Sequence, residues 1–279
     1  MNVINGRYKL EQKLGEGAFS AVCKARCLHT GKIYAVKLDT MKEQHGINLL
    51  KHEATLLHYL QQQKCGDSIP QVHYYGFHEP FTCLLMTYCD QANLHKCTEE
   101  EKLSWWNTML DVLEKIHKCG IVHRDLKPDH FMKQNGRWVL MDFGLANTYL
   151  DSEGNHTKDK QCESIVGSPN YVSYYVHCGH VPSRRDDLIS LFYIFWEVVF
   201  GSFVDKSKQL FSKTYSLDSI YHPYNEYVKH LKKWETLEEN MNQYTHELKI
   251  FMNSMLKYFR NITFDTTPSY KAFVVLLRK

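Results

Sequence analysis

The fold of this chain is decided by two short stretches, His123-Arg124-Asp125-Leu126-Lys127-Pro128 and Leu140-Met141-Asp142-Phe143-Gly144-Leu145. Each stretch carries an aspartate near a proline or a glycine, and both of these residue types interrupt regular structure. The first stretch follows a strongly helical segment, and the second lies a short distance further along. Because loops carry most binding and catalytic residues, Asp125 and Asp142 are the first candidates for chemistry.

Upstream of these stretches the hydrophobic period is that of strands. Residues 7–38 contain three short runs of strand-like residues, separated by a plausible turn at His29-Thr30-Gly31, and the strand pattern returns after Pro70 to end in the apolar run 81–86. Residues 45–63 instead repeat leucines at intervals of three and four, which predicts one helix. A small sheet with a single helix is therefore expected in the first third of the chain.

The rest of the chain has helical periodicity. Thr98-Glu99-Glu100-Glu101 matches a capping box and opens a helix that runs to about His117, and residues 188–200 are apolar nearly all round, which predicts a buried helix. We therefore expect a bilobal α+β fold in one domain of residues 1–279. Residues 1–88 would form a mostly antiparallel, five-stranded N-lobe with one helix, and residues 89–279 a helical C-lobe.

The glycine-rich segment Gly15-Glu16-Gly17-Ala18-Phe19-Ser20-Ala21-Val22 lies between two predicted strands. This position argues against a dinucleotide-binding turn, which joins a strand to a helix, and favours a flap over nucleotide phosphates. Glycines let backbone amides approach phosphates where side chains would collide. By itself the segment is better explained as a glycine-bearing hairpin, because Ser20 stands where a third glycine is usual.

Lys37 and Glu53 form a second candidate pair. Lys37 ends the strand-like run Tyr34-Ala35-Val36, and Glu53 lies on the predicted helix that follows. A lysine at the end of a strand is usually a solvated charge. Its order after the glycines and before Glu53 instead suits a cation that reaches nucleotide phosphates and is held by an ion pair.

Taken together, these segments resemble the eukaryotic protein kinase superfamily. The resemblance implies that Asp125 orients the attacking hydroxyl and accepts its proton, that Lys127 neutralises charge on the γ-phosphoryl group, and that Asp142 binds magnesium. Lysine two places after the catalytic aspartate is the serine/threonine form of the motif. The expected activity is therefore transfer of phosphate from ATP to serine or threonine hydroxyls of protein substrates.

The same resemblance implies a nucleotide site that is closed by a hinge between Thr87 and Cys89, with Val22 on the adenine and Met86 at the back of the pocket. The residues expected to bind the nucleotide are Leu14, Gly15, Gly17, Phe19, Val22, Ala35, Lys37, Glu53, Met86, Thr87, Cys89 and Met132.

Within the superfamily, the chain is most similar to the casein kinase 1 family. Gly167-Ser168-Pro169-Asn170-Tyr171-Val172-Ser173-Tyr174 stands where Ala-Pro-Glu is usual, and Ser183-Arg184-Arg185-Asp186-Asp187-Leu188 opens the long buried helix. This resemblance implies that Asp187 anchors the backbone of the catalytic loop. It also implies that Arg184 helps to bind anions, which would favour acidic or already phosphorylated substrates. A structural ion pair of Arg184 with a nearby acid is an equal alternative.

His130 departs from the family pattern, which has a metal-binding asparagine at this position. Magnesium prefers oxygen ligands, so an imidazole is a poor substitute, and manganese becomes an alternative metal. Two other interpretations remain: His130 caps the loop while water completes the metal shell, or the protein is a pseudokinase that binds nucleotide or partners. A zinc cluster with His117 and His123 is rejected, because nothing places three ligands around one ion. His123 is instead expected to pack the loop.

Composition limits the partners. A net charge of +3 is too small to indicate nucleic-acid binding as the main function. No apolar run approaches the roughly 20 residues that span a bilayer, and no signal-peptide pattern opens the chain, so an intracellular protein without membrane association is expected. The nine cysteines lack paired metal-binding spacing and are expected to be reduced. We further expect a monomer that is active without phosphorylation of the segment 145–166.

Overall fold

The computed structural model describes residues 3–16, 20–40, 48–202, 204, 216–240 and 246–277. Its chain forms two compact units, Met1–Ala92 with Asp129–Leu145, and Asn93–Pro128 with Ala146–Lys279. Strands of residues 129–145 thus group with the first unit, although the sequence assigned these residues to the helical lobe. The reason is strand pairing, because β7 (Asp90–Gln91) pairs with β9 (Phe131–Gln134), which in turn pairs with β10 (Arg137–Leu140).

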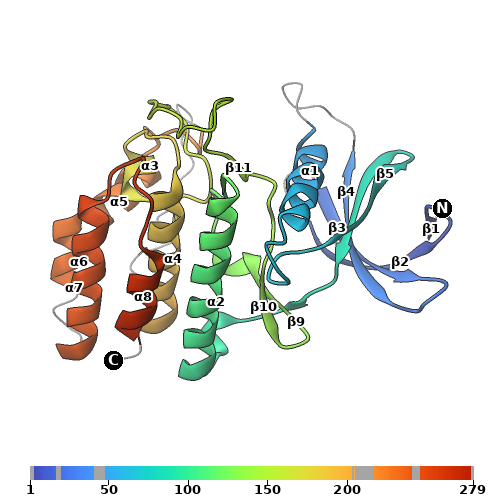
Figure 1. Cartoon of the computed structure of the whole chain (residues 1–279), viewed down its shortest axis with the longest axis horizontal. Coiled ribbons are helices and arrows are strands. Elements are labelled where there is room, and N and C mark those ends of the chain that lie inside the picture. Colours follow the sequence, from blue (N-terminus) through green and yellow to red (C-terminus); the bar gives the residue numbers. More distant parts are fainter. Residues whose placement is uncertain are drawn as a thin grey trace. The chain divides into compact units, whose positions relative to one another are not determined.

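An antiparallel sheet in the order β1-β2-β3-β4-β6-β5 forms the first unit (Figure 1). The strands are β1 (Val3–Ile4), β2 (Tyr8–Glu16), β3 (Ser20–Cys27), β4 (Ile33–Thr40), β5 (Val72–His78) and β6 (Phe81–Thr87). The prediction of five strands was one short. Asn5 and Gly6 adopt φ values of 48° and 60°, which turns Val3 back to pair with Lys9 as a sixth strand.

One helix, α1 (Leu49–Gln62), packs on this sheet, as predicted. It begins at the N-cap Asn48, whose side chain accepts a hydrogen bond from the Lys51 amide. The earlier start expected at residue 45 lies outside the described residues. The buried face of α1 includes Leu50 and Ala54, which pack against Leu84 of β6, so the helix is fixed to the sheet at the level of Lys37.

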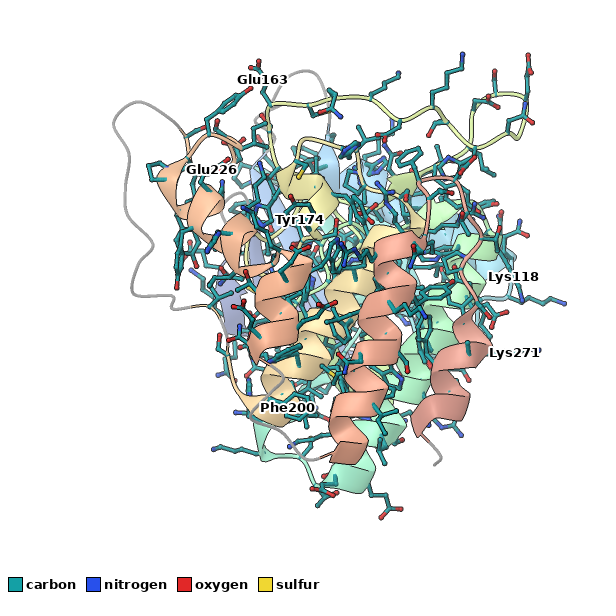
Figure 2. The ribbon with its side chains drawn as sticks, turned by 90° about the vertical axis from the view of Figure 1, so that its left-hand side faces the viewer. Lys118, Glu163, Tyr174, Phe200, Glu226 and Lys271 are labelled. Atoms are coloured by element: carbon teal, nitrogen blue, oxygen red, sulfur yellow. The ribbon has the colours of Figure 1, made fainter. Side chains whose placement is uncertain are left out.

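The second unit is mainly helical, as predicted. Its elements are η1 (Leu94–Lys96), α2 (Glu99–Lys118), β8 (Ile121–Val122), β11 (Asn147–Thr148), α3 (Tyr174–His177), α4 (Arg184–Phe200), α5 (Pro223–Leu231), α6 (Trp234–Asn240), α7 (His246–Asn261) and α8 (Tyr270–Leu277). The capping box of Thr98 and Glu101 is present at the start of α2. Helix α2 contacts α4 and α8, and α7 contacts α6 and α8 (Figures 1 and 2).

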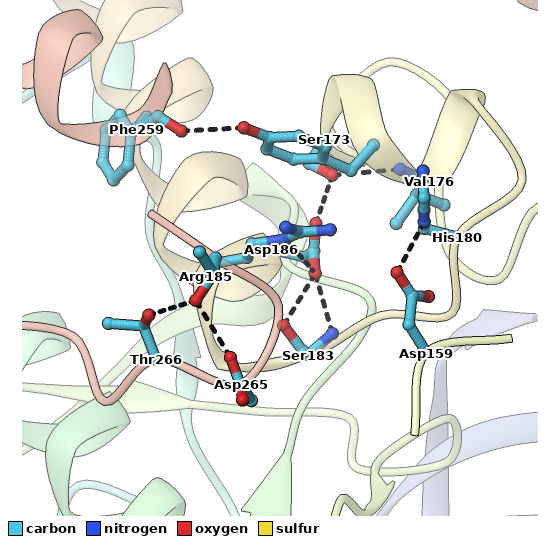
Figure 3. Close-up of polar contacts among 12 residues, drawn as sticks. Asp159, Ser173, Val176, His180, Ser183, Arg185, Asp186, Phe259, Asp265 and Thr266 are labelled. Atoms are coloured by element: carbon cyan, nitrogen blue, oxygen red, sulfur yellow. Dashed lines mark hydrogen bonds and ion pairs between the residues drawn. The ribbon is translucent and has the colours of Figure 1, made fainter. Parts of the chain in front are cut away.

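Helix α4 is the centre of this unit. Every residue from Arg185 to Val198 is buried, which confirms the predicted burial of the apolar run except at its end, where Val199 is exposed. Its first turn is tied to the segment before it, because the Asp186 carboxylate accepts hydrogen bonds from the hydroxyls of Ser173 and Ser183 (Figure 3). Within the described residues, no helix combines the length and hydropathy needed to cross a membrane.

Candidate active site

In the first unit, Lys37 links two acidic side chains. Its Nζ donates to Glu53 Oε2 at 2.8 Å and to Asp142 Oδ1 at 2.9 Å. The predicted ion pair with Glu53 is therefore present. Burial would lower the pKa of Lys37, but the charges of Glu53 and Asp142 raise it above its ordinary value. The lysine is thus a fixed cation on β4.

Glu53 is held from a second side. Only 2% of its side chain is exposed, and the backbone N–H of Phe143 donates to its Oε1 at 3.2 Å. Helix α1, strand β4 and the 142–144 turn therefore meet at one carboxylate. Such a charge is tolerated in the interior because both of its oxygens have a donor.

Asp142 is the most exposed member of this cluster, with 40% of its side chain accessible. Its φ of 62° lies in the left-handed region, which is uncommon for a residue other than glycine and is often found at functional sites. Gly144 keeps the carboxylate accessible, because a Cβ at that position would lie 3.3 Å from Asp142 Oδ1. These residues fit a site for one hard cation and the phosphates that accompany it, since magnesium commonly binds one or two carboxylates and several phosphate oxygens.

His130 lies against the other oxygen of this carboxylate, with Nε2 at 3.2 Å from Asp142 Oδ2. A carboxylate accepts hydrogen bonds, so Nε2 must carry a proton in this arrangement and cannot offer its lone pair to a metal at the same time. Although burial raises the pKa of Asp142, the contacts with His130 and Lys37 outweigh it and hold that pKa well below its usual range. The imidazole is therefore placed to donate to the aspartate through Nε2.

Within the described residues, the side chains around Asp142 do not form a complete set of metal ligands. Across the part of the chain that the structure describes, no three His, Cys, Asp or Glu side chains come together as a candidate metal site. A cation at Asp142 would therefore take its remaining ligands from phosphate oxygens and water, which is the usual coordination of magnesium beside a nucleotide.

An apolar group in the same unit contains several of the residues predicted to contact adenine. Val22 of β3 packs with Ala35 of β4 and Met86 of β6. The strand register places Val22 opposite both Gly15 and Lys37. Three predicted nucleotide residues are therefore brought together on one surface beside the lysine.

The other predicted nucleotide residues are more scattered. Leu14 and Gly15 lie at the end of β2, Thr87 ends β6, and Met132 lies in β9. Burial raises the pKa of the Cys89 thiol to about 11, which keeps it neutral. Gly17 and Phe19 lie outside the described residues.

In the second unit, Asp125 is held by a residue that sequence reasoning missed. The backbone N–H and the hydroxyl of Ser168 donate to Asp125 Oδ1 at 2.8 and 2.7 Å. Lys127 Nζ lies 3.4 Å from the other oxygen, Oδ2. Ser168 sits within the Gly-Ser-Pro string, and nothing in that local pattern assigns its hydroxyl to an aspartate 43 residues upstream.

The loop that carries Asp125 is anchored to α4. Asp187 accepts hydrogen bonds from the backbone N–H groups of His123 and Arg124 at 2.7 and 2.8 Å. This is the anchoring that was expected of Asp187. His123 is fully buried, in agreement with its predicted packing role. Arg124 adopts a φ of 69°, so these hydrogen bonds hold a backbone conformation that would otherwise be unfavourable.

A buried lysine supports the segment that presents Ser168. Lys232 is fully buried, and its Nζ donates to the backbone carbonyls of Pro169 at 2.9 Å and Val172 at 2.6 Å. His177 Nε2 lies 3.0 Å from the same Pro169 carbonyl and 3.3 Å from the lysine. No sequence pattern marked Lys232, which follows a polar helix end beside Lys233.

The His177 site predicts a pH dependence of stability. Burial lowers the pKa of His177 well below its usual range. As pH falls below the ordinary histidine value of about 6.5, the unfolded chain therefore gains a proton that the folded chain does not, and the free energy of unfolding falls. His177→Asn should remove up to about 1.4 kcal/mol per pH unit of this dependence.

Urea unfolding between pH 7.5 and 5.5 measures this effect. His58→Gln is the control, because His58 is an exposed histidine of α1. An unchanged slope in the His177→Asn variant would contradict the prediction.

Arg184 makes structural contacts. Its guanidinium donates to the Thr267 hydroxyl at 2.9 Å and to the backbone carbonyl of Asp265, and it stacks over the Tyr149 ring. These contacts favour the structural alternative over an anion site, although the partner of the arginine is a carbonyl rather than the expected acid.

The segment 145–166 is fastened along its length to the second unit. Cys162 donates its N–H to the Gly179 carbonyl at 2.7 Å, and Ile165 donates to the carbonyl of Asp218. Asp159 accepts from His180 at 2.7 Å (Figure 3). These hydrogen bonds hold residues 159–165 against residues 179, 180 and 218.

Both groups of charged residues lie inside one family match. The family model described as "Protein kinase domain" matches residues 8–262. This match spans both units and includes the Lys37 cluster of the first and the Asp125 loop of the second.

Proposed function

Because the chain belongs to the protein kinase domain family, we propose that it is a serine/threonine kinase that transfers the γ-phosphoryl group of ATP to hydroxyls of protein substrates. The observation that carries this proposal is the double contact of Lys37 with Glu53 and Asp142. A cation fixed in this way beside an accessible carboxylate suits a polyphosphate with its metal. The serine/threonine assignment rests on Lys127, two residues after Asp125.

The protein residues would divide the reaction as follows. The substrate hydroxyl oxygen attacks the γ-phosphorus, the bond to the bridging oxygen breaks, and ADP leaves with that electron pair. The Asp125 carboxylate, held by Ser168, accepts the hydroxyl proton. Lys127 stabilises negative charge on the transferred group. Magnesium held by Asp142, when bound, neutralises charge on the phosphates.

We also propose that the protein is of the casein kinase 1 type. The two strings that carry this resemblance touch each other, since Ser173 of the first donates to Asp186 of the second (Figure 3). The same resemblance implies activity without phosphorylation of the segment 145–166. A preference for acidic substrates is not proposed, because the Arg184 donors hold residues 265–267.

A second candidate function is nucleotide or partner binding with little phosphotransfer. It is favoured by one observation, the donation of His130 to the carboxylate that would hold the metal. A cation that binds Asp142 Oδ2 would compete with this hydrogen bond for the charge on that oxygen. A substitution at residue 130 can therefore distinguish the kinase function from the binding function.

We expect His130→Asn to raise phosphotransfer to casein with magnesium by about tenfold, because it removes the competing donor and adds an amide oxygen. The gain should be smaller with manganese, which accepts nitrogen ligands more readily. The same change should tighten ATP binding in the presence of magnesium and leave metal-free ATP binding unchanged. Turnover and ATP affinity would be measured in both metals.

The control is His58→Asn, an exposed histidine of the same unit. Turnover in wild type with either metal supports the kinase. If His130→Asn is active and wild type is inactive in both metals, the binding function is correct for the natural sequence. If turnover and ATP affinity are both unchanged in His130→Asn, residue 130 does not affect metal binding.

A further inference from the structure

A buried chain of hydrogen bonds connects the C-terminal helix to the catalytic loop. The Tyr270 hydroxyl, at the start of α8, contacts His117 Nδ1 near the end of α2. His117 Nε2 contacts Asp187 Oδ2 at 2.8 Å, and Asp187 holds the backbone of His123 and Arg124. Figure 2 places Lys118 and Lys271, the neighbours of this pair, on the same side of the unit.

The proton positions along this chain follow from chemistry. Although burial raises the pKa of Asp187, the hydrogen bonds from His117 and the loop hold it below its ordinary value, so the carboxylate is an acceptor. His117 Nε2 must then carry the proton. In the neutral imidazole, Nδ1 is an acceptor, and the Tyr270 hydroxyl is its donor.

We propose that Tyr270 is a positioning residue for phosphotransfer, acting through His117 and Asp187 on the loop that carries Asp125. This inference rests on the proposed kinase function. Removal of the hydroxyl would leave Nδ1 in a buried site without its donor, and would free the imidazole to rotate or to change tautomer. Asp187 would then lose the partner that fixes the oxygen to which the His123 amide is bound.

The segment before Tyr270 is itself held in place. Arg184, on the same helix as Asp187, donates to the Asp265 carbonyl and to Thr267. Tyr149 donates from its hydroxyl to the His117 carbonyl at 2.6 Å and lies beneath the Arg184 guanidinium. The position of the Tyr270 hydroxyl is therefore set by the start of α4, the helix that anchors the loop.

The test is Tyr270→Phe, which removes one oxygen and keeps the buried ring. The matched control is Tyr175→Phe on α3, whose hydroxyl donates to the Phe259 carbonyl at 3.1 Å. We expect Tyr270→Phe to lower kcat about tenfold while the KM values for ATP and peptide change little. Amide hydrogen exchange at His123 and Arg124 should also become faster, and Tyr175→Phe should change neither quantity.

Equal effects of the two variants, or unchanged kcat and exchange in Tyr270→Phe, would overturn the proposal. If wild type has no phosphotransfer activity, the proposed function fails but the exchange measurement still decides whether Tyr270 holds the loop. If Tyr270→Phe does not fold, nitrogen chemical shifts of His117 in the wild-type protein provide the test. Protonated Nε2 with unprotonated Nδ1 supports the proposal, and the opposite tautomer overturns it.

Discussion

Asp142→Asn should reduce phosphotransfer by at least about a hundredfold while lowering the free energy of unfolding much less than a substitution of Lys37. The substitution removes the charge that would hold the metal. It leaves the more buried pair of Lys37 and Glu53 in place, with Phe143 still donating to Glu53. The contacts with His130 and Lys37 that hold the pKa of Asp142 low also stabilise the fold, but solvent screens them because the Asp142 side chain is 40% exposed. Turnover and urea unfolding would be measured on the same preparations.

Lys37→Met is the informative comparison. In this variant Glu53, which is 2% exposed, would lose the cation with which it is paired. A buried carboxylate that has lost its cation destabilises the folded state by about 3–5 kcal/mol. Lys37→Met should therefore lose activity and stability together, and full activity in the Asp142→Asn variant would refute the enzyme assignment.

Gly167→Ala should destabilise the second unit by about 3 kcal/mol or more and should also abolish turnover. A Cβ at this position would lie 2.2 Å from the backbone oxygen of Arg124, and the backbone φ is +103°. No flexible side chain can move aside to relieve this contact. Because the next residue is Ser168, the displacement would also separate that hydroxyl from Asp125.

Gly154→Ala isolates the contribution of the contact. Gly154 has a comparable φ of +81°, but a Cβ added there would meet no atom within 4 Å. The free energy of unfolding of this variant should fall by only about 1–2 kcal/mol, which is the cost of a left-handed backbone for a residue with a side chain. Equal losses in the two variants, measured by urea unfolding, would show that close packing at Gly167 is unimportant.

The parts of the site that sequence predicted are those with strong local signals. The order of Lys37, Glu53 and the two aspartate stretches resembles that of protein kinases, and this resemblance predicted the first unit's charged cluster. The helix containing Asp187 was equally visible as an apolar run preceded by a capping sequence. In these regions local preference and tertiary packing agree.

The residues that escaped prediction act through contacts between distant segments. Ser168 and Lys232 have ordinary neighbours in sequence, and their partners are 43 and 63 residues away. The sixth strand, β1, depends on two residues with positive φ and pairs with β2 at only two positions. A run of two residues is too short to show the alternating pattern from which strands are predicted. Arg184 was assigned from resemblance, and the side chain is engaged instead by the backbone near residue 265.

The contact between Tyr270 and His117 bears on where this domain can be cut. The family match ends at residue 262, so a fragment trimmed to that limit would retain every residue with an assigned chemical role. It would nevertheless lack the aromatic ring that packs beside His117 and the hydroxyl that reaches its Nδ1. Helix α2 would then expose a surface that α8 covers. The shortest fragment that preserves the catalytic loop must therefore extend through α8, beyond the boundary that homology alone supplies.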